Sequence, residues 1–258
     1  MYYVMDSFSP VQVVEQFHLL FLAQLGRRLD KTLCALKGGC NLRFFHQSVR
    51  LSEGLDLDVA GIGRHALQDK VRILLRSATF TQVLSARGIA LERVSEPKQT
   101  DTTQRWKIGL RWGSGHTPLP TKIEFSRRGL DDDVAFESVD ARLIRAYQLP
   151  PFMLSHYRAN AALRQKVGAL ANRRELQARD VFDLHHLIAG GAGVEAVHTL
   201  AAHDIERARA NALAIDFATF KSQVLAFLPP DDQSHYDSPA LWDTLVLEVV
   251  EFLPRRGR

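Results

Sequence analysis

The sequence predicts an α+β protein, with a mixed sheet and helices in the first part and a mainly helical second half. Polar and apolar residues alternate at 105–112 and 121–125, as expected for half-buried strands. Apolar residues recur at helical spacing at 13–25 and 65–76. From residue 159 onward the pattern is mainly helical, with a break at the glycine-rich residues 190–193.

The first elements follow in order along the chain. Ser9 before Pro10 is typical of a helix N-cap and first turn, so the opening helix should start there and continue to residue 25. The next expected elements are a strand at 34–36, a helical segment at 41–45, a strand at 55–59, a helix at 65–76 and a β-hairpin at 104–127.

A proline pair, Pro150 and Pro151, separates the mixed part from the helical part. We therefore expect an α/β core at residues 1–150 and a helical C-terminal domain at 151–258. Pro229 and Pro230 mark a break before the last expected helix, at about 241–252. The sequence leaves open whether the two parts form one intimate unit or two separable domains.

The composition is that of a soluble globular protein, with 258 residues of which 46% are hydrophobic and 24% charged. No apolar run reaches the roughly 18–20 residues of a membrane span, and the N-terminus does not resemble a signal peptide. We therefore expect a cytoplasmic protein with no membrane association. Cys34 and Cys40 are its two cysteines, and we expect reduced, buried thiols.

The formal net charge is only +4, but basic residues cluster along the sequence. They gather within residues 164–179, and Arg255, Arg256 and Arg258 end the chain. Clustered arginines can contact the phosphate backbone of a nucleic acid. A solvated helix surface is the alternative interpretation.

The most informative segment is residues 36–59, where a glycine turn precedes a strand that carries two acids. Gly38 and Gly39 allow backbone amides to approach a phosphate and direct a helix N-terminus toward it. Asp56 and Asp58 are two residues apart, so on a strand both carboxylates project from one face. Mg²⁺ prefers one or two carboxylates together with phosphate oxygens and water. The segment therefore predicts nucleotidyl transfer.

Glu124 offers a third carboxylate, on the strand of the sequence TKIEF, with Lys122 on the same strand face. Beside the Asp56 strand it could hold a metal ion or help to take the proton from an attacking hydroxyl. An exposed Lys–Glu pair on a hairpin is the alternative, and such a pair contributes little to stability.

A second charged group lies further along the chain. Lys166 could direct a compact positive charge at a triphosphate. Arg179, Asp180 and Asp183 follow it, and they could complete a site or form an internal salt bridge. For the two aspartates the pattern favours the structural role.

Several motifs in series resemble one family. LKGGCNLRFF, RLSEGLDLDV, TKIEF, QKVGALANR and QARDVFDLHHL occur in its order, across roughly residues 36–187. The chain resembles the AbiEii/AbiGii-type nucleotidyltransferase toxins of bacterial toxin–antitoxin and phage-defence systems. The resemblance implies a DNA polymerase beta-like nucleotidyltransferase core followed by a helical half. It also implies Mg²⁺ or Mn²⁺, a nucleoside triphosphate substrate, an RNA acceptor such as the tRNA 3′ end, and a cognate antitoxin protein.

The resemblance also assigns roles to residues. The metal ligands would be Asp56, Asp58 and Glu124, and the catalytic residues would be these three with Lys166. The nucleotide and its phosphates would be contacted by Lys37, Gly38, Gly39, Cys40, Arg43, Ser52, Lys122, Arg179, Asp180 and Asp183.

The chain departs from the family pattern at two positions. Gly54 stands where the family usually has the first acid of its S-E-D-hydrophobic-D motif. If Asp56 and Asp58 act as the pair instead, the metal site shifts along the strand by two residues, roughly 6.6 Å. Cys40 replaces a small hydroxyl residue, and a thiol is a poorer hydrogen-bond donor.

Three functions therefore stay open at this point. The first is a metal-dependent toxin that transfers a nucleoside monophosphate to RNA, with tRNA as the expected acceptor. The second is a degenerate member of the same fold that binds nucleotide or RNA without turnover, for which Gly54 is the argument. The third is nucleotidyl transfer to a protein hydroxyl or a small molecule.

Overall fold

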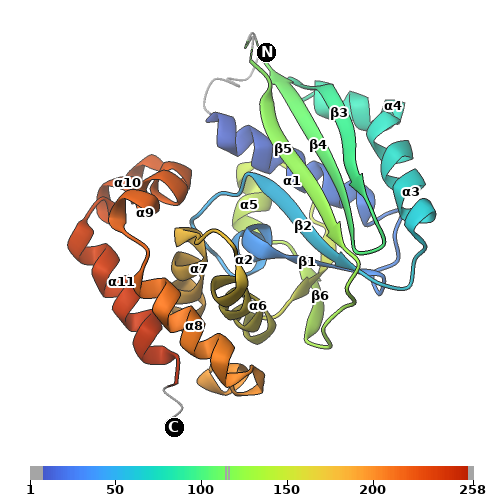
Figure 1. The fold of residues 1–258 in the computed structure, drawn as a ribbon. Coiled ribbons are helices and arrows are strands. Elements are labelled where there is room, and N and C mark those ends of the chain that lie inside the picture. Colours follow the sequence, from blue (N-terminus) through green and yellow to red (C-terminus); the bar gives the residue numbers. More distant parts are fainter. Residues whose placement is uncertain (1–7, 114, 116, 255–258) are drawn as a thin grey trace. The chain divides into compact units, whose positions relative to one another are not determined.

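The structure is a computed structural model that describes residues 8–254 apart from 114 and 116. The C-terminal arginines Arg255, Arg256 and Arg258 lie outside the described residues. The chain forms two compact units, drawn together in Figure 1. Unit 1 comprises Met1–Asn41 and Leu51–His156, and unit 2 comprises Leu42–Arg50 and Tyr157–Arg258. The domain boundary expected after residue 150 stays a prediction.

Unit 1 is built on a mixed sheet, in the order β3-β4-β5-β2-β1-β7-β6, that has seven strands in the described part of the chain. These are β1 (Cys34–Lys37), β2 (Gly54–Val59), β3 (Ile89–Gln99), β4 (Thr103–Trp112), β5 (Leu119–Ser126), β6 (Val134–Ser138) and β7 (Met153–Tyr157). Strand β2 is antiparallel to β1 and parallel to β5, and β4 is antiparallel to β3 and β5. The predicted α+β class and the predicted hairpin are confirmed.

Helices cover one face of the long strands. The helices of this unit are α1 (Pro10–Leu25), α3 (Arg64–Arg76), α4 (Ala78–Ser85) and α5 (Ala141–Ala146), and α2 (Gly38–Phe45) starts in it. Helix α1 begins at the predicted N-cap, where Ser9 and Gln12 form a capping box. Its Phe17 packs on Phe80 of α4, with ring centroids 6.2 Å apart. Figure 1 shows α3 and α4 alongside β3.

Side chains of β4 divide between the two faces of the sheet, as the alternating sequence predicts. Gln104, Trp106, Ile108 and Leu110 are buried, and the side chains between them are wholly or partly exposed. The helices therefore pack on the Trp106 face, and basic side chains lie on the other.

Strands β3, β6 and β7 were not predicted from the sequence. Strand β3 is mostly exposed, and two register shifts against β4 interrupt its alternation. Strand β7 buries the polar residues Ser155 and His156, so its composition does not indicate a strand. It lies beyond residue 150, within the part for which helices were expected.

Unit 2 is helical. Its helices are α6 (Ala159–Asn172), α7 (Ala178–Ala189), α8 (Ala202–Leu213), α9 (Phe217–Gln223), α10 (Pro230–Tyr236) and α11 (Pro239–Phe252), with 3-10 turns at Val194–Thr199 and Leu225–Phe227. Trp242 of α11 lies in its core. The indole stacks on Phe220 with centroids 4.6 Å apart, and its Nε1 donates to the Ile215 carbonyl at 3.1 Å.

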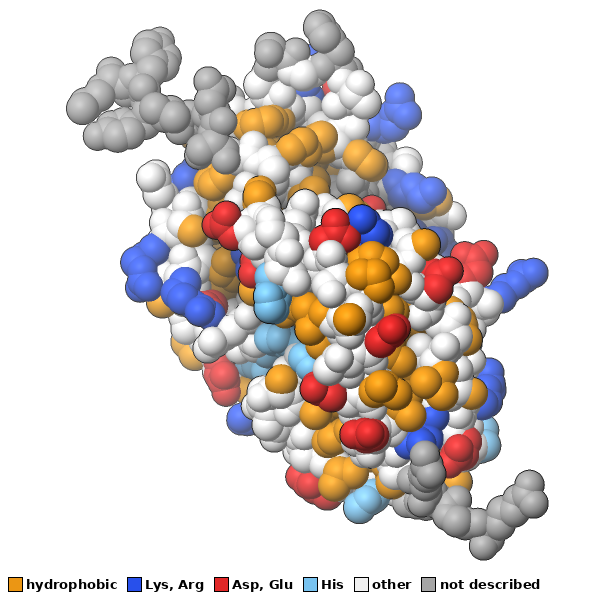
Figure 2. Space-filling model, turned by 90° about the vertical axis from the view of Figure 1, so that its left-hand side faces the viewer, with side chains coloured by type: hydrophobic (Ala, Val, Ile, Leu, Met, Phe, Trp, Pro, Cys, Tyr) orange, Lys and Arg blue, Asp and Glu red, His pale blue; other side chains and the backbone are white. Residues whose placement is uncertain are grey.

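Two findings concern surface and thiols. Hydrophobic side chains lie among acidic ones on the face of α10 and α11 (Figure 2), yet none of the described helices is long and apolar enough to cross a membrane. Cys34 and Cys40 are both buried and outside any disulfide, as predicted, and burial raises the pKa of Cys34 to about 12.

We predict that Trp242→Ala lowers the free energy of unfolding by about 3–5 kcal/mol, because it leaves a large cavity in the core of unit 2. Leu247→Ala on the same helix is the matched control, since Leu247 is 51% exposed, and it should change stability by about 0.5 kcal/mol or less. Urea unfolding followed by circular dichroism measures both. Equal effects of the two substitutions would contradict the assignment of Trp242 to the core.

Candidate functional site

The turn between β1 and α2 brings the start of a helix next to Asp56. Gly38 has a φ of +69°, a left-handed conformation that glycine adopts without steric cost. A Cβ atom on Gly38 would lie 3.3 Å from Oδ2 of Asp56, so the chain passes very close to this carboxylate. Gly39 follows in the first turn of α2, whose backbone N–H groups have no partner within the helix. The arrangement suits an anion beside Asp56.

Strand β2 places Asp56 between two neighbouring strands. Its Cα is paired with Lys37 on β1 and with Glu124 on β5. Nζ of Lys122 lies 3.5 Å from Oδ1 of Asp56, and the Asp56 side chain is 33% exposed. Asp56 is therefore accessible from solvent and has one weak cationic partner.

The other two predicted metal ligands are held in closer ion pairs. Nζ of Lys37 lies 2.5 Å from Oδ1 of Asp58, and Nε of Arg105 lies 2.5 Å from Oε2 of Glu124. The expected surface pair of Glu124 with Lys122 is thus replaced by a pair with Arg105.

A divalent metal ion fits this site in part. In the part of the chain that the structure describes, no group of three or more His, Cys, Asp or Glu side chains could hold a metal ion. Two carboxylates of the predicted trio, those of Asp58 and Glu124, are ion-paired with Lys37 and Arg105. Asp56 alone is open beside the glycine turn. One carboxylate with phosphate oxygens and water meets the requirements of Mg²⁺.

Lys122 occupies the space where a side chain at position 54 would lie. A Cβ atom on Gly54 would approach Cγ of Lys122 to 2.6 Å and Cε to 2.8 Å, both closer than real contacts allow. The Lys122 side chain therefore passes over Gly54 on its way to Asp56. The glycine at position 54 and the lysine at position 122 depend on each other.

Cys40 does not face the phosphate site as predicted. Its thiol is 2% exposed and donates to the carbonyl of Gly54 at 3.4 Å, so it lies in the core beneath β2. Ser52 behaves differently. Its hydroxyl is buried and has no hydrogen-bond partner among the described residues.

A hydrogen-bond chain that the sequence did not indicate supports this end of β2. The Thr121 hydroxyl donates to the Glu53 carbonyl at 2.7 Å, and therefore accepts from Nε2 of His18 at 2.7 Å. Burial lowers the pKa of His18 to about 3, although the charge of Asp56 opposes this. His18 is thus neutral and ties α1 to β5.

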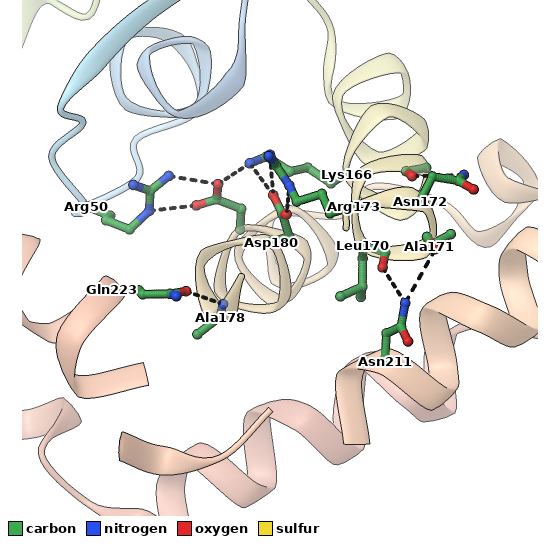
Figure 3. Close-up of polar contacts among 12 residues, drawn as sticks. Arg50, Lys166, Leu170, Ala171, Asn172, Arg173, Ala178, Asp180, Asn211 and Gln223 are labelled. Carbon is green, nitrogen blue, oxygen red and sulfur yellow. Dashed lines mark hydrogen bonds and ion pairs between the residues drawn. The ribbon is translucent and has the colours of Figure 1, made fainter. Parts of the chain in front are cut away.

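Unit 2 contains a buried ion cluster around Lys166 (Figure 3). Nζ of Lys166 lies 3.1 Å from Oδ1 of Asp180 and 2.5 Å from Oδ2 of Asp183. Arg50 donates two hydrogen bonds to Asp183 at 3.0 and 2.8 Å, and Nε of Arg173 donates to Asp180 at 2.6 Å. Three cations thus surround two carboxylates. Arg50 is 133 positions from Asp183, so no local pattern indicated this pair.

Both aspartates of this cluster are fully buried. No carboxylate surface of Asp180 or Asp183 is open to a ligand, so their predicted contact with a nucleotide would be indirect. Each carboxylate instead positions Lys166, Arg50 or Arg173. Burial by itself raises the pKa of Asp183, but the charges of Arg50 and Lys166 bring that pKa well below its ordinary value.

The remaining predicted residues of unit 2 are less enclosed. Arg179 is half-buried and lines a small cavity of about 280 Å³ together with Arg173 and Arg174. Arg43 lies on α2 and donates to the Ser48 carbonyl at 2.9 Å, an interaction that orders the loop after the helix.

We predict that Asp183→Asn destabilises the protein at pH 7 by about 3 kcal/mol, because it leaves Arg50 and Lys166 without a buried counter-charge. The folded pKa of Asp183 is depressed, so its contribution is present above the unfolded pKa of about 4 and is lost as pH falls further. Wild type should therefore lose stability more steeply below pH 4 than this variant. Urea titrations at several pH values measure the slopes, with exposed Asp243→Asn as control. Equal slopes for Asp183→Asn and wild type would refute this assignment.

Comparisons with known proteins were consistent with this geometry. A family model described as "Nucleotidyl transferase AbiEii toxin, Type IV TA system" matches residues 20–253. The fold is similar to MenT4, a nucleotidyltransferase toxin from Mycobacterium tuberculosis H37Rv, with 16% identity, a TM-score of 0.67, and coverage of 96% of this chain and 86% of that one. JHP933 from Helicobacter pylori has 17% identity, a TM-score of 0.62, and coverage of 95% and 91%. No curated protein sequence gives a significant match.

Identities this low show a common fold and nothing finer. The match to the family model is stronger evidence, because it includes the glycine turn, the Asp56 strand, the Glu124 strand and the Lys166 helix. The chain therefore belongs to the AbiEii family of nucleotidyltransferase toxins.

Proposed function

We propose that this toxin transfers a nucleoside monophosphate from a nucleoside triphosphate to the 3′ end of RNA, with tRNA as acceptor, in a reaction that depends on Mg²⁺. The observation that carries the proposal is the contact of the Gly38 turn with Asp56. It supports a phosphate group and a metal-binding carboxylate in one place, which is what nucleotidyl transfer requires.

The glycine turn and Ser52 would bind the phosphates. Backbone N–H groups at the start of α2 and the unpartnered Ser52 hydroxyl would donate to phosphate oxygens. Lys122 would place its ammonium group near the reacting phosphate, since it already reaches Asp56. These groups orient the triphosphate for attack in line with the departing pyrophosphate.

Asp56 would hold the metal ion, with Asp58 as a second ligand if Lys37 turns toward the phosphates. A bound Mg²⁺ ion would neutralise charge that develops on the phosphate oxygens. Glu124 is in register with Asp56 and would be the carboxylate that takes the proton of the attacking hydroxyl. In unit 2, Lys166 and Arg179 remain proposed contacts for the nucleotide.

Membership in a toxin family supports two partners. The triphosphate is the first, and a cognate antitoxin protein is the second. The experiment below also includes total protein and small-molecule fractions, because transfer to a protein hydroxyl or a small molecule is the alternative to transfer to RNA.

We predict that the protein incorporates label from one α-labelled nucleoside triphosphate into total tRNA with Mg²⁺ or Mn²⁺. Asp56→Asn should lower incorporation by at least about 100-fold, because the open carboxylate is lost. Asp69→Asn is the matched control, since Asp69 is exposed on α3, and it should retain full activity. Label on protein or small molecules instead of tRNA would refute the RNA acceptor. No label on any fraction would refute the reaction.

We predict that Gly54→Asp lowers activity, although it restores the family's acid, because the new side chain collides with Lys122. Lys122→Ser removes both the collision and the proposed phosphate contact of Lys122, so Gly54→Asp should lower activity by a smaller factor in the Lys122→Ser background than in wild type. Incorporation of labelled nucleotide into tRNA measures all variants, with Lys122→Ser as the single control. A gain of activity by Gly54→Asp alone would contradict the steric argument.

A further inference from the structure

A basic pocket lies on the open face of strands β3, β4 and β5. Its volume is about 630 Å³, within the usual range for pockets that bind a small molecule. Basic side chains from each strand line it, namely Arg93, Lys107 and Lys122. Its acidic side chain is Glu53, and Ser95 adds a hydroxyl group.

The strand register brings the basic groups together. Lys107 is directly opposite Lys122 across β4 and β5, and Ser95 is opposite Lys107 across β3 and β4. Arg93 is opposite Gly109, and Gly109 is opposite Pro120, so a small residue and a ring form the apolar floor between the charges. Pro118 extends this floor, lying 3.2 Å from where a Cβ of Gly109 would be.

Two of the cations in this pocket have no ion-pair partner among the residues that the structure describes. No ion pair or hydrogen bond joins the exposed side chains of Arg93 or Lys107 to another described residue. By contrast, Arg105 on the same face is paired with Glu124. Cations without an ion-pair partner, beside an apolar floor, are suited to the backbone of a polyanion such as a single-stranded nucleic acid.

The pocket and the glycine turn lie on different sides of Asp56, so each would bind a different one of the two substrates. The glycine turn approaches Asp56 from the β1 side, and the pocket begins at Lys122 on the β5 side. In an in-line transfer the attacking hydroxyl and the departing pyrophosphate lie on opposite sides of the reacting phosphorus. If the glycine turn binds the triphosphate, the acceptor strand must approach from the β5 side.

We infer that this pocket binds the 3′-terminal nucleotides of a single-stranded RNA acceptor, with Arg93 and Lys107 contacting its phosphates. This inference rests on the function proposed above and assigns the acceptor site, for which the sequence motifs gave no residues. Neither residue belongs to the motifs shared with the family.

The test is binding of a fluorescein-labelled single-stranded RNA, ten nucleotides long, to the full chain without divalent metal. Arg93→Gln with Lys107→Gln should raise the Kd about tenfold and reduce the slope of log Kd against log salt by about 1.4, since two phosphate contacts are lost. Arg76→Gln, an exposed arginine at the end of α3, is the matched control and should bind as wild type does. Lys107→Arg keeps the charge and should also bind normally.

Binding of fluorescent ATP, CTP, GTP and UTP analogues is measured in parallel. The double variant should bind the preferred nucleotide within twofold of wild type. The inference would be overturned if the double variant bound the RNA as tightly as the wild-type protein does. It would also be overturned if the double variant lost as much affinity for the nucleotide as for the RNA. These outcomes are separate from the incorporation assay, because an enzyme that labels no RNA refutes the proposed function whatever the binding variants do.

Discussion

Pairing of β2 with β1 on one side and β5 on the other is the constraint on which the candidate site depends. The antiparallel pairing brings Lys37 and the glycine turn to Asp56, and the parallel pairing brings Glu124 and Lys122. A slip of one residue in either pairing would turn these side chains to the opposite face. The buried residues Leu55, Leu57 and Val59 hold the register by filling the core.

Charged side chains around β2 form separate ion pairs, and a bound substrate or metal ion could replace one partner of each pair. Asp56, Asp58 and Glu124 each face a different cation. Partly exposed pairs contribute only about 0–1 kcal/mol. A triphosphate can therefore attract the lysines while a divalent ion attracts the carboxylates, at little cost in stability. The fully buried cluster of Asp180 and Asp183 is different, since exchange of partners there would leave a charge without compensation.

Much of this could be predicted from the sequence, and the failures have physical causes. Local signals placed the Ser9 cap, the Gly38 turn and the alternating hairpin correctly, because each depends on neighbouring residues. The metal trio of Asp56, Asp58 and Glu124 stays a prediction, and the sequence did not indicate that Lys37 and Arg105, which come from neighbouring strands, pair with two of its carboxylates. Cys40 is buried as expected, but its hydrogen bond to a backbone carbonyl on β2 could not be predicted for a similar reason. Contacts between distant segments have no local pattern.

The mutual dependence of Gly54 and Lys122 has an evolutionary consequence. An acid can enter at position 54 only if the Lys122 side chain leaves its present path across the glycine. The two positions should therefore change together between lineages. Relatives with an acid at the first position should then carry a shorter or differently directed side chain at the second.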